Sequence, residues 1–116
     1  MKEIRQGQVY WLDFGPAAGS SPAERHPCVV VQNDVFNRSA IATSVVCLIT
    51  SNLTRAKAPG NVLLTKGEAN LPKASVVNVS QILTVDKAEL AECTGKLSDT
   101  SAKAVRDGLH LLFERL

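Results

Sequence analysis

Apolar positions in this chain fall into short runs separated by Gly, Pro, Ser and Asn, which is the pattern of β-strands joined by turns. The runs predict strands at residues 7–14, 27–32, 44–50, 61–66, 74–79 and 93–97, and residues 82–85 either continue the fifth strand or start another. Residues 28–31 and 45–49 are apolar at every position, so we expect these two strands to be buried on both faces and the later one to be central.

The C-terminal segment changes to the three-and-four spacing of one face of an α-helix. The apolar positions that recur at this spacing are Ala102, Val105, Leu109, Leu112, Phe113 and Leu116. Ser98 or Asp99 is the predicted N-cap. Gly108 lies inside the helix at a cost of about 1 kcal/mol relative to alanine, so packing must hold this segment. A shorter helical turn is predicted at residues 86–90, capped by Asp86.

Five to seven short strands followed by one helix predict a mainly β fold, an SH3-like small β-barrel with the C-terminal helix packed against it. The chain has 116 residues, enough for one core, and we expect residues 1–116 to form a single domain. Two polar loops, at residues 15–22 and 51–60, join the strands. Loops of this length inside a compact domain are usually functional.

Composition narrows the class of protein: 45% hydrophobic and 21% charged residues are typical of a soluble globular chain. No apolar run approaches the roughly 20 residues that span a bilayer, and the polar start is no secretory signal, so we expect a cytoplasmic protein. Cys28, Cys47 and Cys93 are odd in number and lack CxxC spacing. They predict small buried thiols, with no disulfide framework, no metal and no cofactor.

The net charge of +2 is small but unevenly distributed. Residues 1–58 carry six Lys/Arg and four Asp/Glu, whereas the rest of the chain carries seven of each. A basic half is compatible with a nucleic acid backbone as a partner, although solvated surface charges give the same count.

Arg25 and His26 stand directly before an apolar strand, and Pro27 follows them. Because a proline biases the preceding residue toward an extended backbone, we expect the Arg-His pair to stand at the rim of the sheet. Such a position, a polar loop held by a rigid scaffold, suits a reaction site.

Four stretches of the chain resemble the MazF/PemK family of bacterial toxins. They are G-Q-V-Y-W-L-D-F-G-P at residues 7–16, H-P-C-V-V-V-Q-N-D-x-F-N at 26–37, L-I-T-S at 48–51 and S-V-V-N-V-S-Q-I-L-T-V-D at 75–86. Their order and spacing match the family from residue 7 to about 97, and the C-terminal helix fits in position.

The resemblance implies an SH3-like/PemK barrel, a homodimer, and a MazE-like antitoxin that binds across the dimer. It also implies a toxin of a type II toxin–antitoxin module, an mRNA interferase that cleaves single-stranded RNA (mRNA) at short sequence motifs without a metal. The ribose 2′-hydroxyl would be the nucleophile, giving a 2′,3′-cyclic phosphate and a 5′-hydroxyl.

The family usually has an arginine before the proline of the second strand and a Thr or Ser at the end of the third. Thr50 matches the second position, but His26 fills the first and Arg25 precedes it. Histidine can transfer a proton near neutral pH, whereas arginine binds phosphate and is almost never a base. We therefore assign proton transfer to His26 and phosphate contacts to Arg25 and Thr50. Neighbouring strand residues point to opposite sides, so the alternative is that Arg25 alone carries the site and His26 is only a strand-edge residue.

Further residues are candidates for RNA contacts through charge, hydrogen bonding or stacking. They are Phe14, Glu24, Ser51, Asn52, Arg55, Lys57, Asn78 and Gln81. Some relatives carry an arginine and an acid where this chain has Asn78 and Ser80, so no carboxylate base is available there. Structural roles are open for most of these residues, and we expect Trp11 to pack in the core.

Two other classes of protein share such a barrel. A CcdB-like toxin poisons DNA gyrase by binding, without catalysis, and its contacts would lie on the C-terminal helix. An SH3-like interaction domain binds proline-rich ligands through an aromatic groove, and an aromatic content of 4% is poor material for one.

Overall fold

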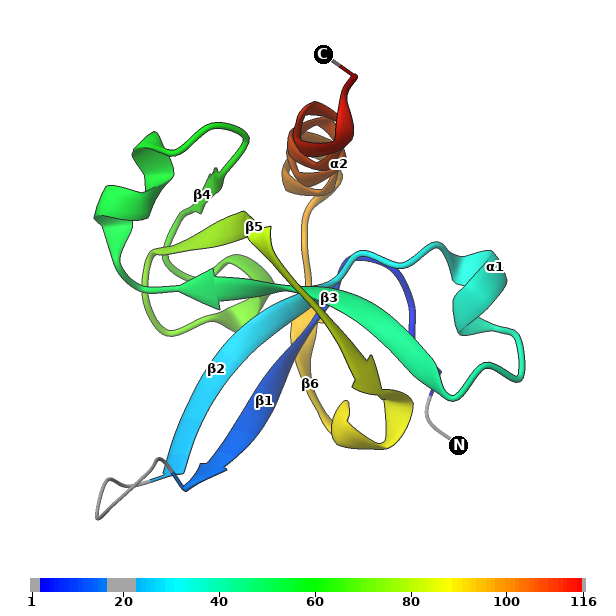
Figure 1. The fold of residues 1–116 in the computed structure, drawn as a ribbon. Coiled ribbons are helices and arrows are strands. Elements are labelled where there is room, and N and C mark those ends of the chain that lie inside the picture. Colours follow the sequence, from blue (N-terminus) through cyan, green and yellow to red (C-terminus); the bar gives the residue numbers. More distant parts are fainter. Residues whose placement is uncertain (1–2, 17–22, 116) are drawn as a thin grey trace.

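The computed structural model describes residues 3–16 and 23–115, and the side chains at 14–16 and 23–24 lie outside that description. Six antiparallel strands form one sheet in the order β4-β5-β3-β2-β1-β6 (Figure 1). Their bounds are β1 Gln8–Pro16, β2 Ala23–Val30, β3 Thr43–Thr50, β4 Val62–Leu64, β5 Ser75–Asp86 and β6 Glu92–Lys96. The predicted loop at 15–22 falls largely on residues 17–22, which are not described.

The sheet curls so strongly that apolar side chains on both of its faces are buried. Val9, Val29 and Ile49 belong to one cluster of core residues, which also contains Val105 of the helix. Tyr10, Cys28 and Val46 alternate with them and belong to a second cluster. The unbroken apolar runs of β2 and β3 are therefore explained. β3 has the predicted central position, and its neighbours are β5 and β2.

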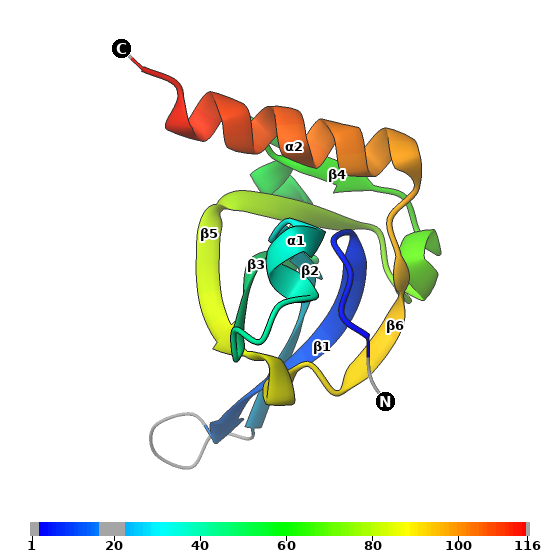
Figure 2. The same cartoon turned by 90° about the vertical axis from the view of Figure 1, so that its right-hand side faces the viewer.

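β5 is one continuous strand, although a polar Ser80-Gln81 pair interrupts its apolar pattern. Opposite β3, the register moves from Cys47↔Ile82 to Leu48↔Asn78, so residues 79–81 are accommodated as a bulge. A bulge increases local twist and bends the strand. β5 accordingly bends around the molecule (Figure 2), and residues 82–85 continue it rather than starting a new strand.

Short helices occupy segments that the sequence predicted as turns or loops. They are α1 Asp34–Asn37, the 3-10 helix η1 Leu53–Lys57 and the 3-10 helix η2 Glu68–Asn70. The predicted turn after Asp86 is the 3-10 helix η3 Lys87–Glu89, held by a capping box between Asp86 and Glu89. η2 packs against β6, where Asn70 Nδ2 donates to the Thr94 carbonyl at 2.8 Å.

The predicted C-terminal helix is α2, Asp99–Phe113, which crosses the curled sheet (Figure 2). Its N-cap is Ser98, whose hydroxyl oxygen accepts from the Ser101 backbone at 3.2 Å. Val105 and Gly108 are buried, and Gly108 meets Gly60 so closely that an added Cβ would lie 2.2 Å from the Gly60 carbonyl oxygen. The glycine that weakens the helix therefore permits the close approach.

The predicted packing face of α2 is wrong at its C-terminal end. Leu112 is 42% exposed and Phe113 72% exposed, because the last turn of the helix lies beyond the curled sheet (Figure 2). Leu116 falls outside the described residues. None of the described helices is long and apolar enough to cross a membrane.

Candidate active site

A groove opens where β2 and β3 separate. The two strands pair from Cys28↔Leu48 to Val30↔Val46, and pairing with β3 starts only after Pro27, which has no N–H to donate. The groove has a volume of about 260 Å³. It is lined by Trp11, Arg25, His26, Pro27, Ile49, Thr50, Ser51, Leu71, Pro72, Lys73 and Ser75. Four predicted site residues, Arg25, His26, Thr50 and Ser51, are therefore gathered in one place.

Both Arg25 and His26 line the groove, although they are neighbours on a strand. Continuing the β2–β3 register past its last pair puts His26 level with Thr50, and Arg25 level with Ser51. Strand alternation then places His26 and Thr50 on one side and Arg25 on the other. Because the groove lies where β2 has separated from β3, it is open to residues from both sides.

Thr50 ends β3 and is half-buried. Its side-chain oxygen accepts a hydrogen bond from the Asn52 backbone N–H at 3.1 Å. A hydroxyl has one proton to donate besides its acceptor positions. The Thr50 hydroxyl proton therefore remains available for an oxygen of a bound molecule, and the Asn52 bond fixes the position of its oxygen.

The Arg25 guanidinium is held at the edge of the groove by two contacts. Its Nη2 donates to Glu92 Oε1 at 2.6 Å, and its Cζ lies 5.2 Å from the centre of the Trp11 ring. Trp11 is the strand partner of both Pro27 and Glu92, so Trp11, Pro27 and Glu92 lie on one face of the sheet. Trp11 packs against the core, as predicted, and also lines the groove.

Asn52, Arg55 and Lys57 lie in or beside η1 and are not among the groove-lining residues. Asn52 caps η1, accepting from the Thr54 backbone at 3.2 Å and from the Thr54 hydroxyl at 2.7 Å. Arg55 and Lys57 are exposed. Their predicted RNA contacts stay predictions, and they would require RNA to extend beyond the groove.

Asn78 belongs to a network of side-chain amides under η1. Its Oδ1 accepts from Asn61 and from Ser80, at 3.3 and 3.1 Å, and its Nδ2 donates to Gln81 Oε1 at 2.9 Å. Asn61 also donates to the Arg55 carbonyl at 2.9 Å, which ties η1 to β5. Asn78 is buried and its amide is occupied within the protein, whereas Gln81 is exposed.

Two further predicted site residues, Phe14 and Glu24, lie in β1 and β2. The side chains of Phe14 and Glu24 lie outside the part of the chain that the structure describes. Their predicted contacts therefore remain predictions.

Sequence reasoning missed Lys73 and Glu92. Lys73 follows Leu71, which is buried, and Pro72, which restricts the backbone, so the sequence signal was a lysine held directly after a core anchor. Glu92 has no such signal, because its contact with Arg25 depends on β6 pairing with β1.

Two of the three cysteines are buried, as predicted, but Cys93 is exposed. Burial raises the pKa of the Cys28 thiol to about 12 and that of the Cys47 thiol to about 11. Both are therefore neutral and unreactive near neutral pH. Within the described ranges, no three His, Cys, Asp or Glu side chains come together as a metal site would require.

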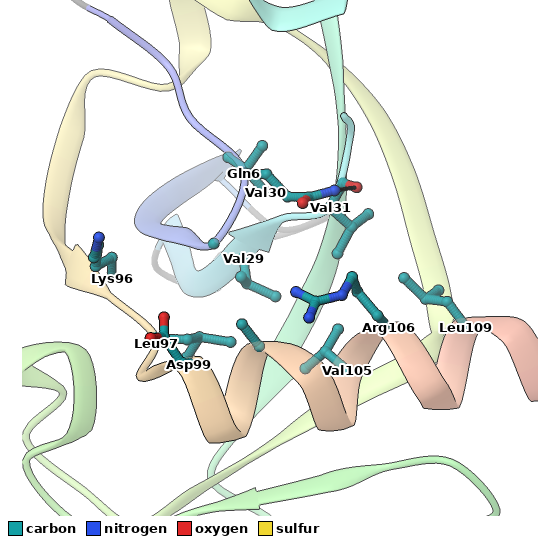
Figure 3. A pocket seen from close by; sticks show the side chains of 12 residues that line it. Gln6, Val29, Val30, Val31, Lys96, Leu97, Asp99, Val105, Arg106 and Leu109 are labelled. Carbon is teal, nitrogen blue, oxygen red and sulfur yellow. Dashed lines mark hydrogen bonds between the residues drawn. The ribbon is translucent and has the colours of Figure 1, made fainter. Parts of the chain in front are cut away.

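A second cavity, of about 160 Å³, lies between residues 6–7, the end of β2 and α2 (Figure 3). Val29, Val105 and Leu109 contribute apolar walls, and Arg106 projects from α2 at its side. None of the predicted site residues lines it. The chemistry-bearing residues thus gather at the β2–β3 groove.

The chain is similar to toxins of the MazF type in sequence and in fold. A family model described as "PemK-like, MazF-like toxin of type II toxin-antitoxin system" matches residues 5–113. The chain is 40% identical over 111 residues to Endoribonuclease MazF2 of Mycobacterium bovis and, to the same extent, to Endoribonuclease MazF6 of Mycobacterium tuberculosis, covering 96% of this chain and 97% of each relative. This chain therefore belongs to the PemK-like, MazF-like toxin family of type II toxin–antitoxin systems.

Solved structures agree with the fold. An endoribonuclease in complex with its cognate antitoxin from Mycobacterial species gives a TM-score of 0.78 at 24% identity, covering 97% of this chain and 98% of that one. A MazE–MazF structure from Deinococcus radiodurans gives 0.80 at 22% identity, with both chains fully covered. The predicted family, the SH3-like/PemK fold and the endoribonuclease class are confirmed, and a CcdB-like toxin is not favoured.

Proposed function

We propose that this chain is a sequence-specific endoribonuclease that cleaves single-stranded RNA through the ribose 2′-hydroxyl, without a metal. The observation that carries the proposal is that Arg25 and His26 of β2 and Thr50 of β3 line one groove. Such a cleavage needs a proton acceptor, a proton donor and groups that stabilise charge on the phosphate.

His26 is the proposed proton-transfer group. Its imidazole takes the 2′-hydroxyl proton as O2′ attacks the phosphorus and the P–O5′ bond breaks. The imidazolium returns a proton to O5′, directly or relayed through a water molecule, leaving a 2′,3′-cyclic phosphate and a 5′-hydroxyl. No proton is gained or lost overall, because the one removed from O2′ is replaced by the one given to O5′.

Arg25 and Thr50 are the proposed phosphate ligands. The guanidinium donates to the non-bridging oxygens and stabilises the added negative charge. The Thr50 hydroxyl donates its proton to the same phosphate, and Ser51 makes a further contact with it. In the alternative, Arg25 alone carries the reaction and His26 has no catalytic role.

The biological assembly follows from the same proposal. Relatives include an endoribonuclease solved with its cognate antitoxin. We extend this to the present chain as one domain, residues 1–116, that forms a homodimer, acts on mRNA in the cytoplasm and is inhibited by a MazE-like antitoxin.

The test is to incubate the purified protein in EDTA with a long single-stranded RNA and with a matched duplex, and to map the cut ends. We expect discrete cuts confined to the single strand, with 5′-hydroxyl ends, and loss of most cleavage in His26→Ala and in Thr50→Ala. Lys103→Ala, on the exposed face of α2, is the matched control and should cut like the wild type.

Two outcomes would change the proposal. Retained cleavage in His26→Ala with loss in Arg25→Ala assigns the reaction to the arginine. If the wild type cuts no RNA, a supercoiling assay with gyrase tests whether the protein acts by binding instead.

A further inference from the structure

The main chain of Lys73 is fixed at the wall of the groove by its neighbours. Leu71, two residues earlier, is only 2% exposed and is anchored in the core. The Leu71 backbone makes two hydrogen bonds, both 3.0 Å long. Its N–H donates to the carbonyl of Glu68 in η2, and its carbonyl accepts from the N–H of Gly67, which precedes η2. On the other side, the Ser75 hydroxyl donates to the Lys73 carbonyl at 2.9 Å. The main chain of Lys73 is therefore fixed from both directions.

The topology places Lys73 and Arg25 on opposite sides of Thr50. β3 lies between β2 and β5 in the sheet. Arg25 belongs to β2. Lys73 lies two residues before the start of β5, in which Val76 is the strand partner of Thr50. The two cationic residues thus come from the segments on either side of the end of β3.

The charges along the groove favour an anion. The described residues that line the groove include Arg25, His26 and Lys73. No Asp or Glu is among the described lining residues. The Arg25 charge is offset by Glu92. No carboxylate within the described part of the chain forms an ion pair with Lys73, so its ammonium is the uncompensated positive charge of the groove.

We propose that Lys73 binds a second RNA phosphate, adjacent to the scissile one, so that the groove holds two successive phosphates of a single strand across β2, the end of β3 and the start of β5. The inference rests on the proposed function. An ammonium is a point charge that contacts phosphate without reading bases. Lys73 therefore contributes to affinity and not to the choice of cleavage motif or to the chemical step.

The experiment compares Lys73→Ala, Lys73→Arg and the wild type, with Lys66→Ala as the control. Lys66 is also exposed and lies, like Lys73, between β4 and β5, but it does not line the groove. The probe is a short RNA that carries the cut motif mapped for the wild type, with a 2′-deoxy nucleotide at the cleavage position so that it binds without reacting. Kd is measured over a series of salt concentrations, and single-turnover cleavage of the unmodified RNA is measured at saturation.

In Lys73→Ala we expect Kd to rise roughly fivefold near physiological salt. The slope of log K against log salt should become shallower by about 0.7, the loss of one single-strand phosphate contact. Lys73→Arg should restore the slope, Lys66→Ala should keep it, and the cleavage rate at saturation and the cut motif should not change.

A wild-type slope in Lys73→Ala, a changed cut motif, or a large loss of rate at saturation would each overturn the assignment of Lys73. These results are distinct from failure of the proposed function, in which the wild type neither binds nor cuts single-stranded RNA and the inference falls with it. Thermal unfolding of each variant checks the fold, which exposed lysines should leave unchanged.

Discussion

Arg25 Nη2 lies 2.6 Å from Glu92 Oε1, so the cation proposed to bind the scissile phosphate already has an anionic partner. Both side chains are substantially exposed, at 48% and 62%. An exposed ion pair contributes only about 0–1 kcal/mol to stability. The pair therefore matters less for the fold than for the charge that RNA meets, because a phosphate must compete with Glu92 for the guanidinium.

Glu92→Gln should bind RNA more tightly than the wild type and with a steeper salt dependence, because it removes a negative charge next to the groove. The free energy of unfolding should change by less than about 1 kcal/mol. Titration of the 2′-deoxy RNA at several salt concentrations checks the first expectation and urea unfolding the second. Weaker binding would mean that Glu92 acts mainly by orienting Arg25.

Thr50→Val should lower the rate at saturating RNA by about 100-fold or more, because it removes a donor aimed at charge that develops on the phosphate. The two side chains are nearly equal in size. Thr50→Ser keeps the hydroxyl and should retain most of the rate. Single-turnover cleavage measures both, and equal loss in the two variants would point to packing rather than to the hydroxyl.

Gly108→Ala should destabilise the fold even though alanine is the better helix former by about 1 kcal/mol. The new Cβ would lie 2.2 Å from the Gly60 carbonyl oxygen and 3.2 Å from Val79 Cγ1, so α2 must move away from the sheet. Overpacking of this kind costs about 1–3 kcal/mol. Urea unfolding measures it, and Lys103→Ala on the exposed face should change stability by only about 0.5 kcal/mol. A more stable Gly108→Ala would contradict the close contact.

The free energy of unfolding should fall at acid pH in part because of Asp34. Burial acts to raise its pKa, but hydrogen bonds from the Gln6 backbone and Asn37, with the charges of Arg5 and Arg38, hold the pKa below its usual value. A carboxylate whose pKa is lower in the folded than in the unfolded state stabilises the fold. This stabilisation is fully present at a pH above the unfolded-state pKa and is lost as the pH falls through the folded-state pKa.

Asp34→Asn should therefore be less stable than the wild type at pH 7, and the difference should shrink as the pH is lowered below about 4. Unfolding of both proteins by urea at a series of pH values measures the difference. A difference that stays constant with pH would show that charge on Asp34 is not its cause.

The sequence by itself determined the elements that depend on short-range patterns. Unbroken apolar runs identified the central strands, because a strand buried on both faces has no polar side. Asp86 was predicted as a helix cap, and Ser98 as one of two candidates with Asp99, because a cap is a bond between a side chain and a backbone only a few residues away. The resemblance of four stretches to one toxin family, now confirmed, also lies in the sequence alone.

The tertiary structure decided everything that depends on distant segments meeting. Glu92 reaches Arg25 only because β6 pairs with β1, and Lys73 reaches the groove only because β5 pairs with β3 beside β2. Likewise, helical periodicity predicted Phe113 on the packing face of α2, but it could not show that the curled sheet ends before that turn. Local pattern specifies which way a side chain faces within its element, whereas long-range pairing specifies what stands opposite.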